Sequence, residues 1–149
     1  MISKTAINIH LILLAFLGLS AIGGGVALII SPSGKLLGGL PLSLLQHSPF
    51  KNFLIPGIIL FVVLGLFPSL LIFSLLKKQT SAFAEQFNFF KDMHWAWSFS
   101  IYQAFALIIW LQTEMYFLQA VDWLHNFYML LAILIIFVAL LPSVRNFYK

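Results

Sequence analysis

Four long apolar runs, separated by shorter polar or Gly/Pro-rich segments, form the main pattern of this chain. Each run is close to the ~20 residues that an α-helix needs to cross a hydrocarbon core of ~30 Å. The third run is the shortest, and no internal repeat is visible. We therefore predict an all-α fold, a four-helix transmembrane bundle, with spans at about residues 6–30, 53–76, 95–111 and 123–141.

Two of the runs carry residues that shape helix packing. In the first run, Gly18, Ala21 and Gly25 recur at helical spacing and form one smooth face. A neighbouring helix can approach such a face closely, so we expect it to be buried against protein. In the second run, Pro68 lacks the N–H that a regular helix uses, which predicts an architectural kink near Leu64.

The segment between the first two runs, residues 31–57, is too broken for a helix and too apolar for an ordinary loop. Its prolines fix φ and its glycines permit tight reversals, whereas its leucines need an apolar environment. A connection of this length is usually functional or disordered, and this composition argues against disorder. We expect an outward-facing Pro/Gly-rich cap, residues 31–57, folded onto the membrane-embedded body.

Residues 77–94 form the longest polar interval, yet three phenylalanines recur in it at helical spacing. This pattern predicts an amphipathic helix on the membrane surface. Alternatively, the interval continues directly into the third span, although Asp92 could cap and break such a helix. The phenylalanines are Phe83, Phe87 and Phe90, and the polar residues expected to face elsewhere are Glu85, Asn88 and Lys91.

The composition indicates an integral membrane protein and a single domain over residues 1–149. The chain is 62% hydrophobic and 8% charged, against the ~25% charged residues of soluble domains. The absence of cysteine excludes disulfides and thiolate metal sites. The expected partners are the lipid bilayer and either further copies of the chain or other membrane protein subunits; nucleic acid is not an expected partner.

The distribution of cations predicts the orientation in the membrane. Six of the eight Lys and Arg residues lie on the side of the two termini, and Lys35 and Lys51 lie in the cap. Because cytoplasmic segments are enriched in cations, we expect both termini in the cytoplasm and the cap outside.

A group of ionisable residues is expected near the outer surface. Glu114 and Asp122 belong to the short link between the last two spans, His47 lies in the cap, and His125 begins the fourth span. Two carboxylates and two imidazoles could bind a divalent metal or move protons. The simpler interpretation, which we favour, is that Asp122 caps the fourth helix with His125 close behind.

A polar stripe is predicted on the third span. At helical spacing Gln103, Leu107, Trp110 and Glu114 share one face, which should point into the bundle and away from lipid. Such a stripe could line a cavity for a headgroup or small solute. We favour the alternative that its polar groups are satisfied by the cap, with Gln46 or His47 as donors to Glu114.

No sequence motif indicates catalysis. The chain has no GxSxG motif, no Ser/His/Asp set and no Gly-rich phosphate loop after a strand, so an enzymatic role is not expected. His10 and His94 invite comparison with a pair of haem ligands, but neither has the small-residue pocket that a porphyrin needs. We expect no cofactor and no metal.

Parts of the sequence resemble a family of small uncharacterised bacterial membrane proteins with four spans. The resemblance lies in Pro32, Gly34, Leu37-Gly38, Leu40-Pro41, Leu45, Ser48-Pro49-Phe50 and the run from Phe53 to Leu60 with Gly65, and later in Trp110, Glu114 and Trp123-Leu124. A fainter general similarity to DoxX-like proteins is also present. The resemblance implies a four-helix fold and a bacterial inner membrane, with no activity.

Two hypotheses about function remain. The first is a small structural or accessory membrane protein, self-associating or attached to a larger complex. The second is a binding or transport protein that holds a lipid-soluble molecule, a headgroup or an ion at the stripe of Gln103, Trp110 and Glu114.

Overall fold

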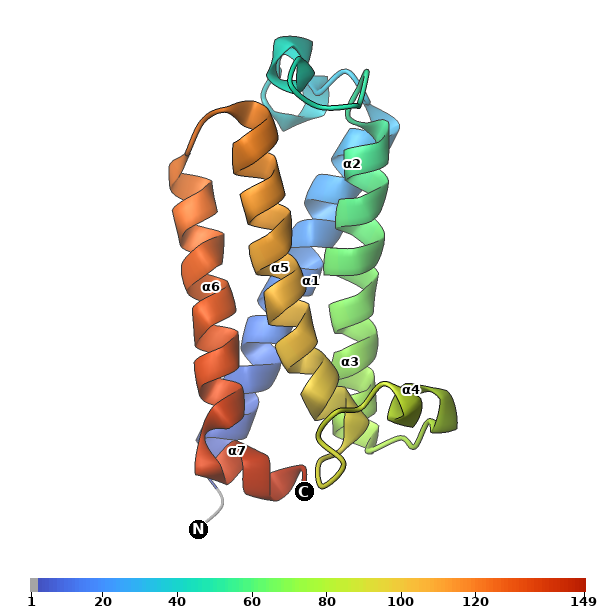
Figure 1. Cartoon of the computed structure of the whole chain (residues 1–149), viewed down its shortest axis with the longest axis vertical. Coiled ribbons are helices and arrows are strands. Elements are labelled where there is room, and N and C mark those ends of the chain that lie inside the picture. Colours follow the sequence, from blue (N-terminus) through green and yellow to red (C-terminus); the bar gives the residue numbers. More distant parts are fainter. Residues whose placement is uncertain (1–2) are drawn as a thin grey trace.

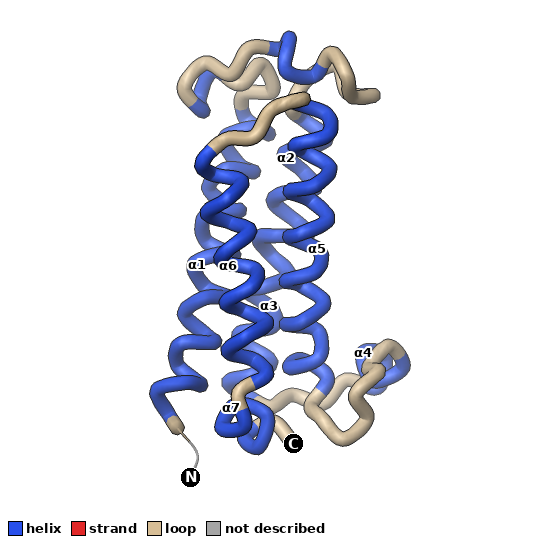
Figure 2. The backbone as a smooth tube through the Cα atoms, turned by 60° about the vertical axis from the view of Figure 1, so that its left-hand side comes forward, coloured by secondary structure: helices blue, strands red, loops and turns tan. Residues whose placement is uncertain are grey.

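The computed structural model describes residues 3–149, which form helices joined by short loops, with no β-strand in that range (Figures 1 and 2). The all-α prediction is therefore confirmed. The elements are α1 (Lys4–Ile30), η1 (Lys35–Leu37), η2 (Leu42–Leu45), α2 (Leu54–Ile59), η3 (Leu60–Leu66), α3 (Phe67–Lys77), α4 (Ala82–Gln86), α5 (Trp95–Leu118), α6 (Trp123–Leu140) and α7 (Pro142–Phe147).

The long helices lie side by side with their axes roughly along the longest axis of the molecule (Figure 1). The continuous segment α2–η3–α3 packs on α1, and α5 packs on α6. The start of α1 and the C-terminus, with α4 and α7, lie at one end of the molecule, which we name the terminal end. The cap lies at the opposite end, the cap end.

Within residues 3–149, three helical segments are long and apolar enough to cross a membrane: Lys4–Ile30, Leu54–Lys77 and Trp123–Leu140. The helix α5 is not among them, because its Ser, Gln, Trp and Tyr side chains lower its mean hydropathy. The helix that contains the predicted third span, residues 95–111, is longer than that span. The helix continues through Gln112 and Glu114 to Leu118, so only residues 119–122 link α5 to α6, and α6 is shorter than α5.

The contact between α1 and α2–η3–α3 is made by glycines on both sides, as the small-residue face of α1 predicted. A Cβ atom on Gly25 would lie 2.7 to 2.8 Å from the Cβ, Cα and N atoms of Phe61. A Cβ on Gly65 would lie 2.8 Å from Cγ1 of Ile22, and one on Gly57 would lie 2.7 Å from Cβ of Leu28. The two backbones therefore approach as closely as the absence of side chains permits.

The predicted kink at Pro68 takes the form of a π-helix. Residues Leu60–Leu66 form η3, in which hydrogen bonds span five residues, so the N–H of Phe67 donates to the carbonyl of Val62. The extra residue per turn displaces the hydrogen-bond register just before Pro68. The irregular hydrogen bonding thus extends over the turn that precedes the proline, whereas the sequence predicted a single bend near Leu64.

The cap folds onto the body in part. Leu45 and Phe53 are buried and pack with Leu28 of α1 in a second, small apolar cluster. The ring of Phe50 lies edge-on to Phe117 of α5, with centroids 6.4 Å apart. Other cap leucines stay exposed, which the sequence analysis did not anticipate: Leu36, Leu37 and Leu42.

The polar interval 77–94 contains only the short helix α4, so the long amphipathic helix predicted there is wrong. Asn88, expected to face away from the phenylalanines, is 1% exposed and holds the loop onto α5. Its Oδ1 accepts a hydrogen bond from Ser98 at 2.6 Å, and its Nδ2 donates to the carbonyl of Met93 at 2.9 Å. Asp92 does not cap α5, because the N-cap is His94, whose Nδ1 accepts from the N–H of Ala96.

Candidate functional site

At the cap end, the candidate site centres on Glu114 of α5 and His125 of α6. Nε2 of His125 lies 3.9 Å from Oε2 of Glu114, which is within ion-pair range but longer than a hydrogen bond. The side chain of His125 is 9% exposed and that of Glu114 is 35% exposed. Trp110, one turn earlier on α5, is a further polar neighbour of the Glu114 carboxylate.

The start of α6 fixes the orientation of the His125 ring. Asp122 and His125 form a capping box, in which each side chain accepts from the backbone of the other residue. The backbone N–H of Asp122 donates to Nδ1 of His125 at 2.9 Å, so in the neutral ring the proton is on Nε2, toward Glu114. The predicted cap at Asp122 is therefore present, and His125 belongs to it.

Gln103, the deepest residue of the predicted stripe, is 2% exposed and supports the π-helix. Its Nε2 donates to the carbonyl oxygen of Val63 at 3.0 Å. The N–H of Phe67 donates to the carbonyl of Val62, five residues earlier. In the same register the carbonyl of Val63 would accept from the N–H of residue 68, but Pro68 has no N–H. Gln103 therefore supplies from α5 the hydrogen bond that the proline removes.

His47 lies apart from this group. Its Nε2 is 3.2 Å from Nε2 of the adjacent Gln46, and both side chains are exposed at the cap end. Neither residue hydrogen-bonds to Glu114, so the donors expected from the cap are not there, and the carboxylate lies beside His125 and Trp110 instead. In the part of the chain that the structure describes, no three His, Asp or Glu side chains come close enough to hold a metal ion.

An apolar groove of about 250 Å³ opens beside the stripe, between η3 and α5. Trp110 and Thr113 form its α5 side, and Val63, the residue whose carbonyl Gln103 binds, lies in its opposite wall. The other lining residues are Ile59, Leu64, Ala106 and Ile109. Glu114 does not line the groove, but Trp110, which does, lies beside the Glu114 carboxylate.

A buried polar contact near the terminal end was not predicted from the sequence. His10 of α1 is fully buried, with Nε2 3.0 Å from Oγ of Ser100, which in turn donates to the carbonyl of Trp97 at 2.6 Å. Ser100 thus accepts from Nε2, and Nδ1 of His10 has no partner among the described residues. Tyr148 packs edge-on against His10, and burial raises the pKa of its phenol to about 12.

Together, the fold and these contacts define a helical protein with three apolar helices that suit a membrane location. Comparison of the chain with family models, with curated proteins and with solved structures gave no match. The resemblance to small four-span bacterial proteins therefore stays a prediction, and the function must be argued from this chain alone.

Proposed function

We propose that the protein is a small integral membrane protein with a structural or accessory role. In this proposal it crosses the bilayer four times, through α1, α2–η3–α3, residues 95–111 of α5 and α6, with both termini in the cytoplasm. The resemblance described above favours a bacterial inner membrane. The cap then lies on the outer face, where its prolines and glycines allow it to cover the ends of the helices.

The observation that carries this proposal is the apolar outer surface of the long helices. Large hydrophobic side chains point away from the core on α1, α3 and α6, where Leu19 is 70%, Leu70 60% and Phe137 61% exposed. Contiguous apolar surface of this extent is unfavourable in water and suits a hydrocarbon environment. The exposed phenylalanines beside α4, such as Phe83 and Phe89, would then lie in the interfacial layer.

The structural role is supported by the hydrogen bonds of the polar side chains, which satisfy backbone groups of the helices. Gln103 satisfies a carbonyl of the π-helix, and Asp122 and His125 cap α6. Each of these contacts stabilises the fold. The exposed leucines of the cap, Leu36 and Leu42, provide apolar surface that suits contact with a second copy or with another membrane subunit.

Native mass spectrometry of the purified full-length chain tests this role. We expect a defined oligomer or a complex with a stoichiometric partner subunit. Replacing Leu36 and Leu42 by Ser should shift the distribution toward the single chain, whereas replacing the exposed Ser33 by Ala should leave it unchanged. A single chain without partner in the unmodified protein, at all concentrations, would argue against the accessory role.

The groove at Trp110 favours a second function, the binding or transport of a lipid-soluble molecule. The groove is apolar, opens at the π-helix, and is lined by Trp110, which lies beside the Glu114 carboxylate. A ligand that combines an apolar body with a polar end would match this arrangement. Replacing Ala106 by Trp should fill the groove, so a small molecule that co-purifies with the unmodified protein and is absent from this folded variant would support the second function.

A further inference from the structure

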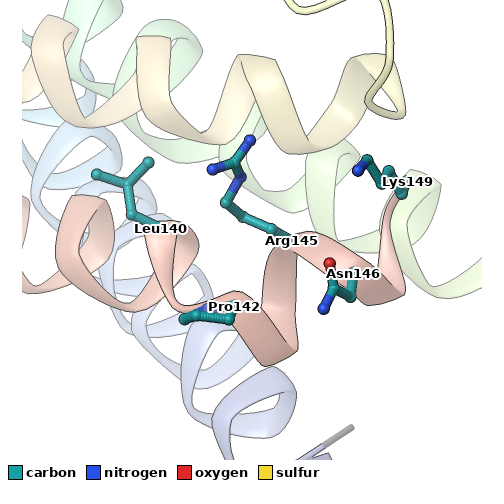
Figure 3. Close-up of a pocket in the computed structure, with 5 residues that line it drawn as sticks. All are labelled: Leu140, Pro142, Arg145, Asn146 and Lys149. Atoms are coloured by element: carbon teal, nitrogen blue, oxygen red, sulfur yellow. The ribbon is translucent and has the colours of Figure 1, made fainter. Parts of the chain in front are cut away.

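A basic pocket lies at the terminal end, where the chain turns from α6 into α7. It has a volume of about 170 Å³ and is lined by Leu140, Pro142, Arg145, Asn146 and Lys149. The side chain of Arg145 extends from α7 and lies between Leu140 and Lys149 in Figure 3. Lys149 follows at the end of the same segment. Pro142 begins α7, and its ring restricts the preceding Leu141 to an extended conformation, φ −57° and ψ 137°, which turns the chain from α6 into α7.

The cations of this pocket have no carboxylate partner in residues 3–149. The ion pair recorded there is the contact of His125 with Glu114, at the cap end of the molecule. A third cation, Lys78, also contacts α7, with Nζ 3.0 Å from the carbonyl of Phe147 and 4.2 Å from its ring centroid. The pocket and its rim therefore present an excess of positive charge.

The lining joins this charge to the apolar surface of α6. Leu140 lines the pocket and is 48% exposed, and Phe137, one turn earlier, is 61% exposed. An amphiphile with its tail along this face of α6 would place its polar end at Arg145 and Lys149. The guanidinium of Arg and the amide of Asn146 are suitable donors to phosphate oxygens.

We propose that this pocket binds the phosphate group of an anionic phospholipid in the leaflet at the terminal end. Arg145 and Lys149 pair with the phosphate, Asn146 adds a neutral donor, and Leu140 and Phe137 guide the acyl chains. Basic pockets beside membrane helices on the cytoplasmic side hold anionic headgroups in this manner. The proposal rests on the membrane placement described under the proposed function.

The test is lipid retention by the full-length protein, measured by native mass spectrometry after release from nanodiscs of equal phosphatidylglycerol and phosphatidylcholine. We expect phosphatidylglycerol to be retained in preference to phosphatidylcholine. The double variant Arg145→Gln, Lys149→Gln should lower that retention by roughly tenfold or more, since each cation near a membrane surface contributes about 1 kcal/mol.

The control is the double variant Lys35→Gln, Lys51→Gln, which removes the same charge from the cap end and should retain phosphatidylglycerol as the unmodified protein does. Circular dichroism would confirm that both variants are folded. Equal retention in all three proteins, or equal loss in both variants, would overturn the proposed site.

A final arm adds 10 mM inorganic phosphate, with sulfate at matched ionic strength as its control. Displacement of the lipid by phosphate but not by sulfate would overturn the assignment to a phospholipid, because the pocket would then bind free phosphate. Failure of the unmodified protein to incorporate into nanodiscs would instead count against the membrane placement, so the two failures are distinguishable.

Discussion

Gln103 shows how one side chain can compensate for a backbone defect elsewhere in the fold. The carbonyl of Val63 lacks a helical donor because Pro68 occupies the donor position, and Nε2 of Gln103 supplies the hydrogen bond at 3.0 Å. In an apolar environment, an unpaired carbonyl is costly because no water replaces the missing donor. The stability of the π-helix therefore depends on a residue of α5.

We predict that Gln103→Leu lowers the free energy of unfolding by about 1–2 kcal/mol, because the Val63 carbonyl is left without a partner. In a Pro68→Ala background the cost should be smaller, since the new N–H at position 68 can reach that carbonyl. Thermal unfolding in detergent measures both effects, with the exposed Gln112→Leu on the same helix as the control. Equal costs of Gln103→Leu in the two backgrounds would contradict the link to Pro68.

Glu114 distinguishes the two candidate functions. Because glutamine keeps an oxygen acceptor for His125 and Trp110, Glu114→Gln should unfold within a few degrees of the unmodified protein. Glu114→Leu removes that acceptor and should cost about 1–3 kcal/mol. Both are measured by thermal unfolding in detergent, beside mass spectrometry of co-purifying small molecules.

A folded Glu114→Gln variant that has lost a co-purifying ligand would favour the binding or transport function. A variant with unchanged stability and unchanged ligand content would agree with a structural carboxylate. If instead Glu114→Leu is as stable as the unmodified protein, the contacts of Glu114 do not hold α5 and α6 together.

At this scale the sequence was sufficient for some residues and insufficient for others. The cap at Asp122 is a local arrangement, set by residues three positions apart, so it could be predicted. The inward position of Gln103 followed from helical spacing. The hydrogen-bond partner of Gln103 could not be predicted, because the free carbonyl of Val63 depends on the π-helical register of another segment. The contact of His10 with Ser100 could not be predicted either, because it joins residues 90 positions apart.

Among the helices, the closest packing is between α1 and the segment α2–η3–α3. The face of α1 that carries Gly18 and Gly25 is buried, and Gly57 and Gly65 meet it from the other side. The glycine run at 23–25 also contains a position that makes no such contact. At Gly23 an added Cβ would meet nothing within 4 Å.

We predict opposite effects of alanine at these two positions. Gly25→Ala places Cβ within 2.8 Å of the Phe61 backbone, which cannot move aside as a side-chain tip can, so it should destabilise the protein by about 1–3 kcal/mol. Gly23→Ala should be neutral or stabilising by up to about 1 kcal/mol, because alanine favours the helix. Unfolding midpoints in detergent compare the two, and equal midpoints would show that α1 does not pack as described.

The elements also show where periodicity misleads. The phenylalanines at 83, 87 and 90 recur at helical spacing, but the chain leaves the helix after Gln86 and Asn88 turns inward to bind Ser98 and Met93. A tertiary hydrogen bond therefore overrides the local pattern. The end of α5 was misplaced for a related reason, since Gln112 and Glu114 are polar enough to suggest a loop although the helix continues through them.

For the whole molecule, the uneven distribution of charge along the long axis is the main guide to topology. Six cations, Lys4, Lys77, Lys78, Lys91, Arg145 and Lys149, belong to segments at the terminal end, and two, Lys35 and Lys51, belong to the cap. We predict that reporter fusions after residue 149 and within the cap give opposite signals, with the fusion at 149 reporting the cytoplasm.

A fusion at the N-terminus should match the fusion at residue 149, which serves as an internal control. Opposite signals at the two termini would indicate an odd number of crossings and would place α5 outside the membrane. Equal signals at the cap and at residue 149 would contradict the orientation as a whole.

The π-helix η3 also has a consequence for how the length of this segment can change. In a regular α-helix, residues eight positions apart differ in direction by about 80°, yet Gly57 and Gly65 both face α1. The wider turn of η3 brings them into line. Deleting one residue of η3 would place these glycines seven positions apart, which differ in direction by only about 20° in a regular α-helix, so both would still face α1. The segment therefore tolerates the loss of one residue from η3, which returns the backbone to regular helical geometry and keeps the glycine contact with α1.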